Sequence, residues 1–174
     1  LGGPPLTSGR MLKIDTHTHI MPKSLPDWSR KLGYGAFIHL EHHKEGAARM
    51  MQGDRFFREV QANCWDAEIR IEEYARSGVQ VQVICTIPVL FAYWAKPEDT
   101  HDIARFLNDD VARTVQDHPR QYIGLGTLPM QDTELSLQEL ERCKAIGLQG
   151  IQIGSNINGY NLSEPCLLYT SPSP

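Results

Sequence analysis

Residues 13–20 read Lys13-Ile-Asp-Thr-His-Thr-His-Ile20, and the organisation of the chain follows from them. Side chains alternate between the two faces of a β-strand, so Asp15, His17 and His19 would share one face. Two imidazoles placed in this way can point at one metal ion, and imidazole suits Zn²⁺ and its first-row neighbours. The alternative is a pair of exposed histidines near the start of the chain. The β-type segment before the pair and Met21-Pro22 after it favour a metal site.

The composition limits the class of protein. The chain has 174 residues, of which 41% are hydrophobic and 22% charged, as in a single globular domain. A net charge of -4 without a basic run argues against nucleic-acid binding. We expect no membrane segment, because no apolar run is long enough and residues 1–10 lack the apolar core of a signal peptide. The cysteines form no C-x-x-C pattern, so a cytosolic protein without a disulfide framework is expected.

Helical and extended segments alternate after residue 65. Asp66 is a good N-cap, and Gly78 and Gly147 are good helix stops. Pro97 suits the first turn of a helix that Pro119 ends. We predict helices over residues 67–77, 97–118 and 133–146, and strands over residues 79–87, 122–128 and 150–154. The last helix is expected to bury its apolar side, namely Leu137, Leu140 and Cys143.

An excursion separates the first strand from the first long helix. We predict two strands in it, at residues 36–41 and 55–60, with a turn at residues 51–54. Arg58 lies here, and an arginine at such a place is more often a solvated surface charge. Its planar guanidinium group, with paired N–H donors, would suit a substrate carboxylate if it faced the histidines. The other histidines are interpreted as surface or supporting residues (His39, His42, His43) or as solvated residues at helix ends (His101, His118).

This order of elements predicts right-handed βαβ units around a parallel sheet. In barrels of this type the site lies at the carboxyl ends of the strands. His17 and His19 fall at the end of the first strand, and Trp94 and Met130 follow the second and third. The aromatic loop at residues 89–96 is interpreted either as core or as a pocket wall.

The histidine motif followed by Met21-Pro22 resembles the first-strand metal motif of the amidohydrolase superfamily. Further motifs, in the same order from about residue 11 to residue 162, resemble the decarboxylase branch that acts on 2-amino-3-carboxymuconate 6-semialdehyde. These motifs are Gly33-Tyr-Gly35, Phe57-Arg58, Asn63-Cys-Trp-Asp66, Tyr93-Trp-Ala-Lys-Pro-Glu-Asp-Thr100, Gly124-Leu-Gly-Thr-Leu-Pro-Met-Gln131, Glu141-Arg-Cys143 and Gln152-Ile-Gly154.

The resemblance implies a zinc-dependent, non-oxidative decarboxylase on a (β/α)₈ barrel. Its product would be 2-aminomuconate 6-semialdehyde, in the kynurenine branch of tryptophan breakdown, and its action would limit quinolinate and NAD formation. By position, His17 and His19 match two zinc ligands, and Arg58 matches the arginine that holds a substrate carboxylate. The resemblance also implies a homodimer in which the partner's arginine reaches the site.

The chain departs from this branch at its carboxyl end. In the branch, a third histidine ligand, a catalytic histidine and an aspartate ligand lie on later strands. A (β/α)₈ barrel takes about 250 residues, and a catalytic zinc takes three protein ligands or more. We therefore expect residues 11–164 to form about four βα units of a barrel, without catalytic residues and inactive alone. Residues 1–10 are interpreted as a disordered, non-native extension and residues 165–174 as an artefactual tail.

Two other functions stay open at this point. One is a metal-dependent hydrolase or another aromatic-acid decarboxylase of the same superfamily. The other is a non-catalytic half-barrel that binds the full enzyme.

Overall fold

The computed structural model describes residues 11–163. The expectations for residues 1–10 and 165–174 lie outside the described residues. None of the helices in the described part is long and apolar enough to cross a membrane.

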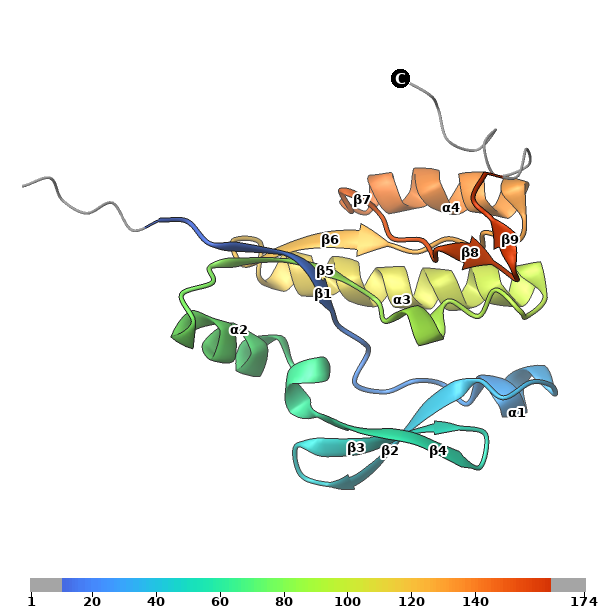
Figure 1. The fold of residues 1–174 in the computed structure, drawn as a ribbon, viewed down its shortest axis with the longest axis horizontal. Coiled ribbons are helices and arrows are strands. Elements are labelled where there is room, and N and C mark those ends of the chain that lie inside the picture. The colour runs from blue at the N-terminus through green and yellow to red at the C-terminus, as the bar shows by residue number, and fades with distance from the viewer. Residues whose placement is uncertain (1–10, 164–174) are drawn as a thin grey trace, which may run out of the picture.

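A parallel sheet forms the body of the structure (Figure 1). Its strands lie in the order β1-β5-β6-β7, so each strand pairs with the next one of the series along the chain. Their bounds are Ile14–His19 for β1, Val81–Cys85 for β5, Tyr122–Gly126 for β6 and Gly150–Ile151 for β7. The predicted parallel α/β fold is confirmed, although β7 is shorter than predicted.

Three helices cover one face of this sheet: α2 (Ala67–Arg76), α3 (Pro97–Asp117) and α4 (Thr133–Ala145). The predicted caps are present, because the Asp66 carboxylate accepts hydrogen bonds from the backbone of Glu68 and Ile69, and Asp132 accepts one from Leu135. We call the opposite face of the sheet the inner face. The core on the helix side holds Ile20, Ile84, Val111, Ala112, Tyr122, Cys143 and Leu148.

The buried side of α4 differs from the prediction. Leu137 is 46% exposed, whereas Ser136, Glu139 and Cys143 are buried. The helix is rotated because the Glu139 carboxylate is held in the interior by hydrogen bonds from α3 and from its own helix. The prediction was therefore wrong for Leu137, whereas Cys143 is buried as predicted and Leu140 is partly buried.

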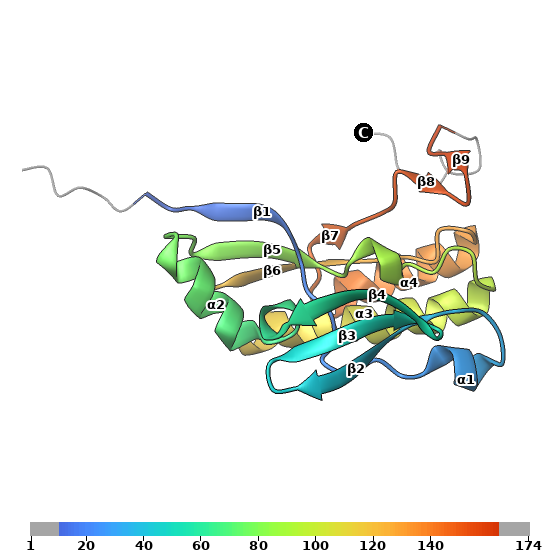
Figure 2. The ribbon, with the colours of Figure 1, turned by 60° about the horizontal axis from the view of Figure 1, so that its bottom comes forward.

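The excursion is larger than predicted (Figure 2). A short helix, α1 (Trp28–Leu32), leads into an antiparallel sheet of β2 (Ile38–Lys44), β3 (Ala47–Gln52) and β4 (Arg55–Gln61). The prediction missed β3 because alanine, arginine and methionine are not strand formers. The small sheet packs on the body through a core that includes Ile38, Ala48, Met50, Val60, Leu90, Ile103 and Leu107.

The segments that follow the parallel strands meet at one end of the sheet. In Figure 1 these ends point to the right, toward the ribbon of β8 (Asn156–Ile157) and β9 (Tyr160–Asn161). Short 3₁₀ turns lie at Ala62–Cys64 and Pro88–Leu90. Phe91 and Tyr93 are buried against Ile157, while Trp94 is 50% exposed. The aromatic loop therefore supplies both core and an exposed wall.

Candidate active site at the carboxyl ends of the strands

His17 and His19 lie together on the inner face at the end of β1. Thr18 between them faces the helices, where its hydroxyl bonds Arg70 and lies 3.4 Å from the hydroxyl of Tyr74. The two imidazole rings are 4.8 Å apart between centroids, nearly perpendicular to each other. His17 is exposed and His19 is partly buried. The predicted shared face is confirmed for the two histidines. It is wrong for Asp15, because a bulge lies between Asp15 and Thr18, and Asp15 pairs with Gln82, whose amide bonds Arg70 on the helix side.

The surroundings of His19 prepare it as a metal ligand. Its Nδ1 lies 3.1 Å from the backbone carbonyl of Thr86, an acceptor that fixes the proton on Nδ1 and leaves the lone pair on Nε2. Burial is the largest cause that lowers the pKa of His19, which keeps the ring neutral. Burial also raises the pKa of the neighbouring Cys85 to about 11, so this residue is a thiol that donates to the Thr18 carbonyl.

The two histidines are not a complete metal site. Within residues 11–163, no group of three or more histidine, cysteine, aspartate or glutamate side chains is arranged to hold a metal ion. Asp15 accepts a hydrogen bond from the backbone N–H of His17 at 3.2 Å. The donor set fits two ligands of a divalent metal, and further ligands would come from elsewhere.

Arg58 lies on β4, opposite Met50 on β3. Opposite residues of an antiparallel pair project on the same side, so Arg58 shares the face of the small sheet that carries the buried Met50 and Val60. Its side chain is exposed and lies over the ring of Phe57 at 5.3 Å. No contact among the described residues joins Arg58 to His17 or His19, so its role stays a prediction.

The histidines of the small sheet are outside the site. His39 lies 3.7 Å from Glu41, and His43 lies 3.4 Å from Glu59. The Nε2 atom of His42 lies 2.7 Å from the carbonyl oxygen of Lys23. His42 and His43 lie at the surface, whereas His39 is partly buried.

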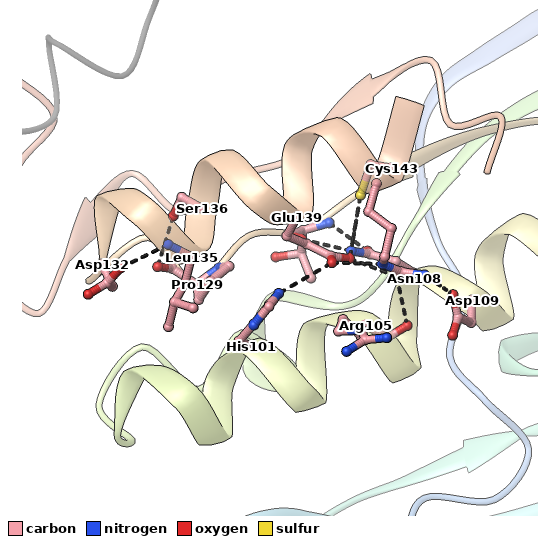
Figure 3. Close-up of polar contacts among 12 residues, drawn as sticks. His101, Arg105, Asn108, Asp109, Pro129, Asp132, Leu135, Ser136, Glu139 and Cys143 are labelled. Carbon is pink, nitrogen blue, oxygen red and sulfur yellow. Dashed lines mark hydrogen bonds and ion pairs between the residues drawn. The ribbon is translucent and has the colours of Figure 1, made fainter. Parts of the chain in front are cut away.

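A buried polar network between α3 and α4 holds the end of β6 (Figure 3). The Asn108 amide accepts from the backbone N–H of Thr127 at 2.8 Å and donates to its carbonyl at 2.9 Å. Asn108 also donates to Glu139 at 2.6 Å, and Arg142 donates to the same carboxylate through Nε and Nη2 at 2.8 Å. His101 lies 3.6 Å from Glu139 and is only 17% exposed. The prediction that His101 is solvated was wrong, because this carboxylate draws it inward.

Sequence reasoning missed this network, although one signal was present. Asn108 lies within the apolar repeat of α3 formed by Ile103, Leu107 and Val111. A polar residue on a buried helix face needs a partner, which points to a hydrogen-bonded contact at this position.

An open hollow of about 580 Å³ lies at the same end of the sheet. Pockets that bind small molecules have volumes of this order. Ala92 and Asn158 in its wall have φ angles of +53° and +52°, a conformation that non-glycine residues rarely adopt. The Asn158 amide donates to the Tyr93 carbonyl at 2.7 Å. The lining includes Gln52, Phe91, Tyr93, Trp94, Gly154 and Asn156.

The chain belongs to the amidohydrolase family, whose pattern it matches over residues 14–169. It is 54% identical over 159 residues to a Dictyostelium discoideum protein named 2-amino-3-carboxymuconate-6-semialdehyde decarboxylase. This match covers 91% of this chain and 44% of that protein. A Caenorhabditis elegans protein of the same name is 38% identical over 165 residues, covering 83% of this chain and 41% of the relative. The chain thus spans less than half the length of these curated relatives.

A solved structure shares this fold over less than half of its own length. The crystal structure of 5-carboxyvanillate decarboxylase from Novosphingobium aromaticivorans, complexed with manganese and 4-hydroxy-3-methoxy-5-nitrobenzoic acid, matches with a TM-score of 0.67 and 22% identity. The match covers 90% of this chain and 45% of that one. The fold is therefore the first portion of a (β/α)₈ barrel, with β1 and β7 as the edge strands of the described sheet.

Proposed function

We propose that this chain is the N-terminal part of a metal-dependent decarboxylase that converts 2-amino-3-carboxymuconate 6-semialdehyde into 2-aminomuconate 6-semialdehyde and CO₂. The observation that carries the proposal is the pair His17 and His19 on the inner face, with Nδ1 of His19 held by the Thr86 carbonyl. The identity of 54% to the Dictyostelium relative supports the choice of substrate.

The chemistry requires charge stabilisation at one carbon. Loss of CO₂ leaves an electron pair on the carbon that carried the carboxylate, and this carbon must then be protonated. A divalent metal, when bound, supplies Lewis-acid stabilisation of the conjugated system. His17 and His19 would hold that metal. Arg58 would orient a substrate carboxylate through two parallel N–H donors without giving up a proton.

We propose Zn²⁺ as the metal, because a pair of imidazole ligands suits it. The manganese in the related solved structure makes Mn²⁺ the competing choice. Measuring the metal bound to purified full-length protein by mass spectrometry separates the two. A protein that is active with manganese and inactive with zinc would refute the zinc assignment.

The remaining expectations belong to the same proposal. The enzyme would act in the kynurenine branch of tryptophan catabolism, where it limits quinolinate and NAD formation. It would work in the cytosol as a homodimer, with an arginine from the partner reaching the site. The proposal includes no nucleic-acid or membrane partner.

We propose further that residues 1–174 are inactive alone. Two protein ligands do not complete a catalytic metal site, and within residues 11–163 no strand pairs with the outer edges of β1 and β7. Assaying this chain beside the full-length protein tests the point. Turnover by the isolated chain at the full-length rate would contradict it.

The decisive experiment uses purified full-length protein and freshly generated 2-amino-3-carboxymuconate 6-semialdehyde. We expect loss of substrate with release of one CO₂ per molecule, abolished by a chelator and restored by metal. Failure to consume this substrate while 5-carboxyvanillate is decarboxylated would favour the aromatic-acid alternative, which the related barrel structure supports. Hydrolysis of an amide or ester panel would favour a hydrolase.

A non-catalytic half-barrel is the second candidate function, and the edge strands β1 and β7 of the sheet formed by residues 11–163 favour it. Such a chain would bind the full enzyme. Co-expression of tagged residues 1–174 with the untagged full-length protein decides this, since the absence of a co-purifying complex removes the candidate.

A further inference from the structure

Gln152 follows β7 at the carboxyl end of the parallel sheet. Its backbone N–H donates to the carbonyl of Gly126 at 2.8 Å, which continues the pairing of β6 with β7 by one residue. This bond fixes the position of Gln152 relative to the strand ends that form the candidate site.

The register places Gln152 on the inner face. A side chain added at Gly126 would meet Cys143, Asn108 and Leu148, so this position faces the helices. Ile151 pairs with Gly126 and packs against the helix-side core. Because side chains alternate along a strand, Gln152 projects to the opposite side.

His19 projects to the same side as Gln152. Its neighbour Thr18 pairs with the buried Ile84 and contacts α2, so His19 and its partner Cys85 point away from the helices. Three strand spacings separate β1 from β7, or about 14 Å along the sheet. A metal-bound substrate and the two side chains can span this distance.

The amide of Gln152 is without a partner in the described part of the chain. Its Oε1 is buried from solvent and accepts no hydrogen bond. Gln131 shows the contrast: its Oε1 is equally unpaired, but its nitrogen is tied to Thr100 and Ala95. No hydrogen bond among residues 11–163 holds either end of the Gln152 amide.

A buried acceptor without a donor costs free energy, and a ligand that brings the donor recovers it. The proposed substrate carries an amino group beside its carboxylates, and this group is an N–H donor. We propose that Gln152 is a specificity-determining residue whose Oε1 accepts a hydrogen bond from the amino group of the substrate. This inference rests on the proposed function.

The test uses full-length protein with Gln152→Met, which keeps the length of the side chain and removes the acceptor. We expect kcat/KM for 2-amino-3-carboxymuconate 6-semialdehyde to fall about tenfold, mainly through KM, the effect of one lost hydrogen bond. Metal content should stay unchanged, and the melting temperature should not fall, because the substitution removes a buried acceptor that lacks a donor. Gln152→Glu keeps an acceptor and should recover most of the loss.

The matched control is Gln149→Met, an exposed glutamine of the same segment whose amide bonds the Gly147 carbonyl. It should leave KM unchanged. Wild-type protein that does not turn over the substrate refutes the proposed function. If the wild type is active and folded Gln152→Met has an unchanged KM, the role of Gln152 is refuted while the proposed function stands. If Gln152→Met does not fold, KM of Gln152→Asn, whose shorter amide withdraws the acceptor, decides in the same way.

Discussion

The side-chain amide of Asn108 forms hydrogen bonds with both the backbone N–H and the backbone carbonyl of Thr127, just after β6. It thereby makes the bonds that a neighbouring strand would otherwise make at this position. Asn108 is 1% exposed and Thr127 2% exposed. Water therefore cannot take over these bonds if the amide is removed. The α3–α4 network sets the position at which β6 delivers its terminal residues to the candidate site.

The first prediction concerns this pairing. Asn108→Ala should lower the free energy of unfolding by about 3 kcal/mol or more, because it leaves buried groups of Thr127 and Glu139 unpaired. Urea denaturation measures the change. Gln116→Ala, at an exposed position of the same helix, is the control and should stay within about 0.5 kcal/mol. Equal effects of the two substitutions would show that the pairing is unimportant.

The second prediction is alkaline instability. Burial raises the pKa of Tyr122 to about 12 and that of Cys143 to about 12. Unfolded tyrosine and cysteine lose their protons at about 10 and 8.5. Between these values and about 12 the folded state binds more protons than the unfolded state, so stability falls as pH rises.

Unfolding midpoints measured from pH 8 to pH 12 test this sign. Tyr122→Phe should flatten the decline above pH 10, and it should cost about 1 kcal/mol at neutral pH through the lost bond to the Ala67 carbonyl. Tyr160→Phe, at a residue that is 65% exposed, is the control. A decline of the same slope in Tyr122→Phe and in wild type would contradict the assignment.

The third prediction separates backbone strain from packing. Gly33 and Gly35 both have φ of +76°, but a Cβ at Gly35 would lie 2.6 Å from the Trp94 ring, whereas nothing lies within 4 Å at Gly33. Gly33→Ala should cost about 1–2 kcal/mol from backbone conformation alone. Gly35→Ala should cost more and displace Trp94. Thermal unfolding of both variants checks this order, and the reverse order would overturn it.

The fourth prediction concerns metal binding in the full-length protein. His17→Ala and His19→Ala should each lower metal affinity more than tenfold, because each removes a proposed ligand. Metal content after dialysis is the measurement. His118→Ala is the control, since that ring packs against Tyr122 on the helix side. Full metal content in both ligand variants would rule out the site.

The fifth prediction concerns Arg58. Arg58→Lys keeps the charge and removes the bidentate fork, so KM should rise about tenfold while metal content stays constant. Arg55→Lys, on the same strand and also exposed, should leave KM unchanged. An unchanged KM in both variants would show that Arg58 does not bind the substrate and is a solvated surface charge, which is the more common role of an arginine at such a place.

Much of this arrangement was predictable because it depends on local pattern. Alternation placed His17 and His19 on one face correctly, although a bulge puts Asp15 on the other, and the caps at Asp66 and Asp132 gave the helix starts. These features depend on residues within a few positions of each other.

The failures depend on distant partners. The inward position of His101 and the rotation of α4 away from Leu137 both follow from the buried carboxylate of Glu139. In the sequence, Gln152 stands out only as part of a motif. Its position on the inner face depends on the register between β6 and β7, which the sequence does not show. The sequence shows such residues but not the pairing that gives them their surroundings.

The strand order β1-β5-β6-β7 has a consequence for biosynthesis. Each parallel strand finds its neighbour in the unit made just before it, so these contacts can form as the chain leaves the ribosome. The two histidines would then be set in place early, and the exposed edge of β7 would wait for whatever is translated next. A pause in translation after β7 has left the ribosome would leave that edge open to other nascent chains.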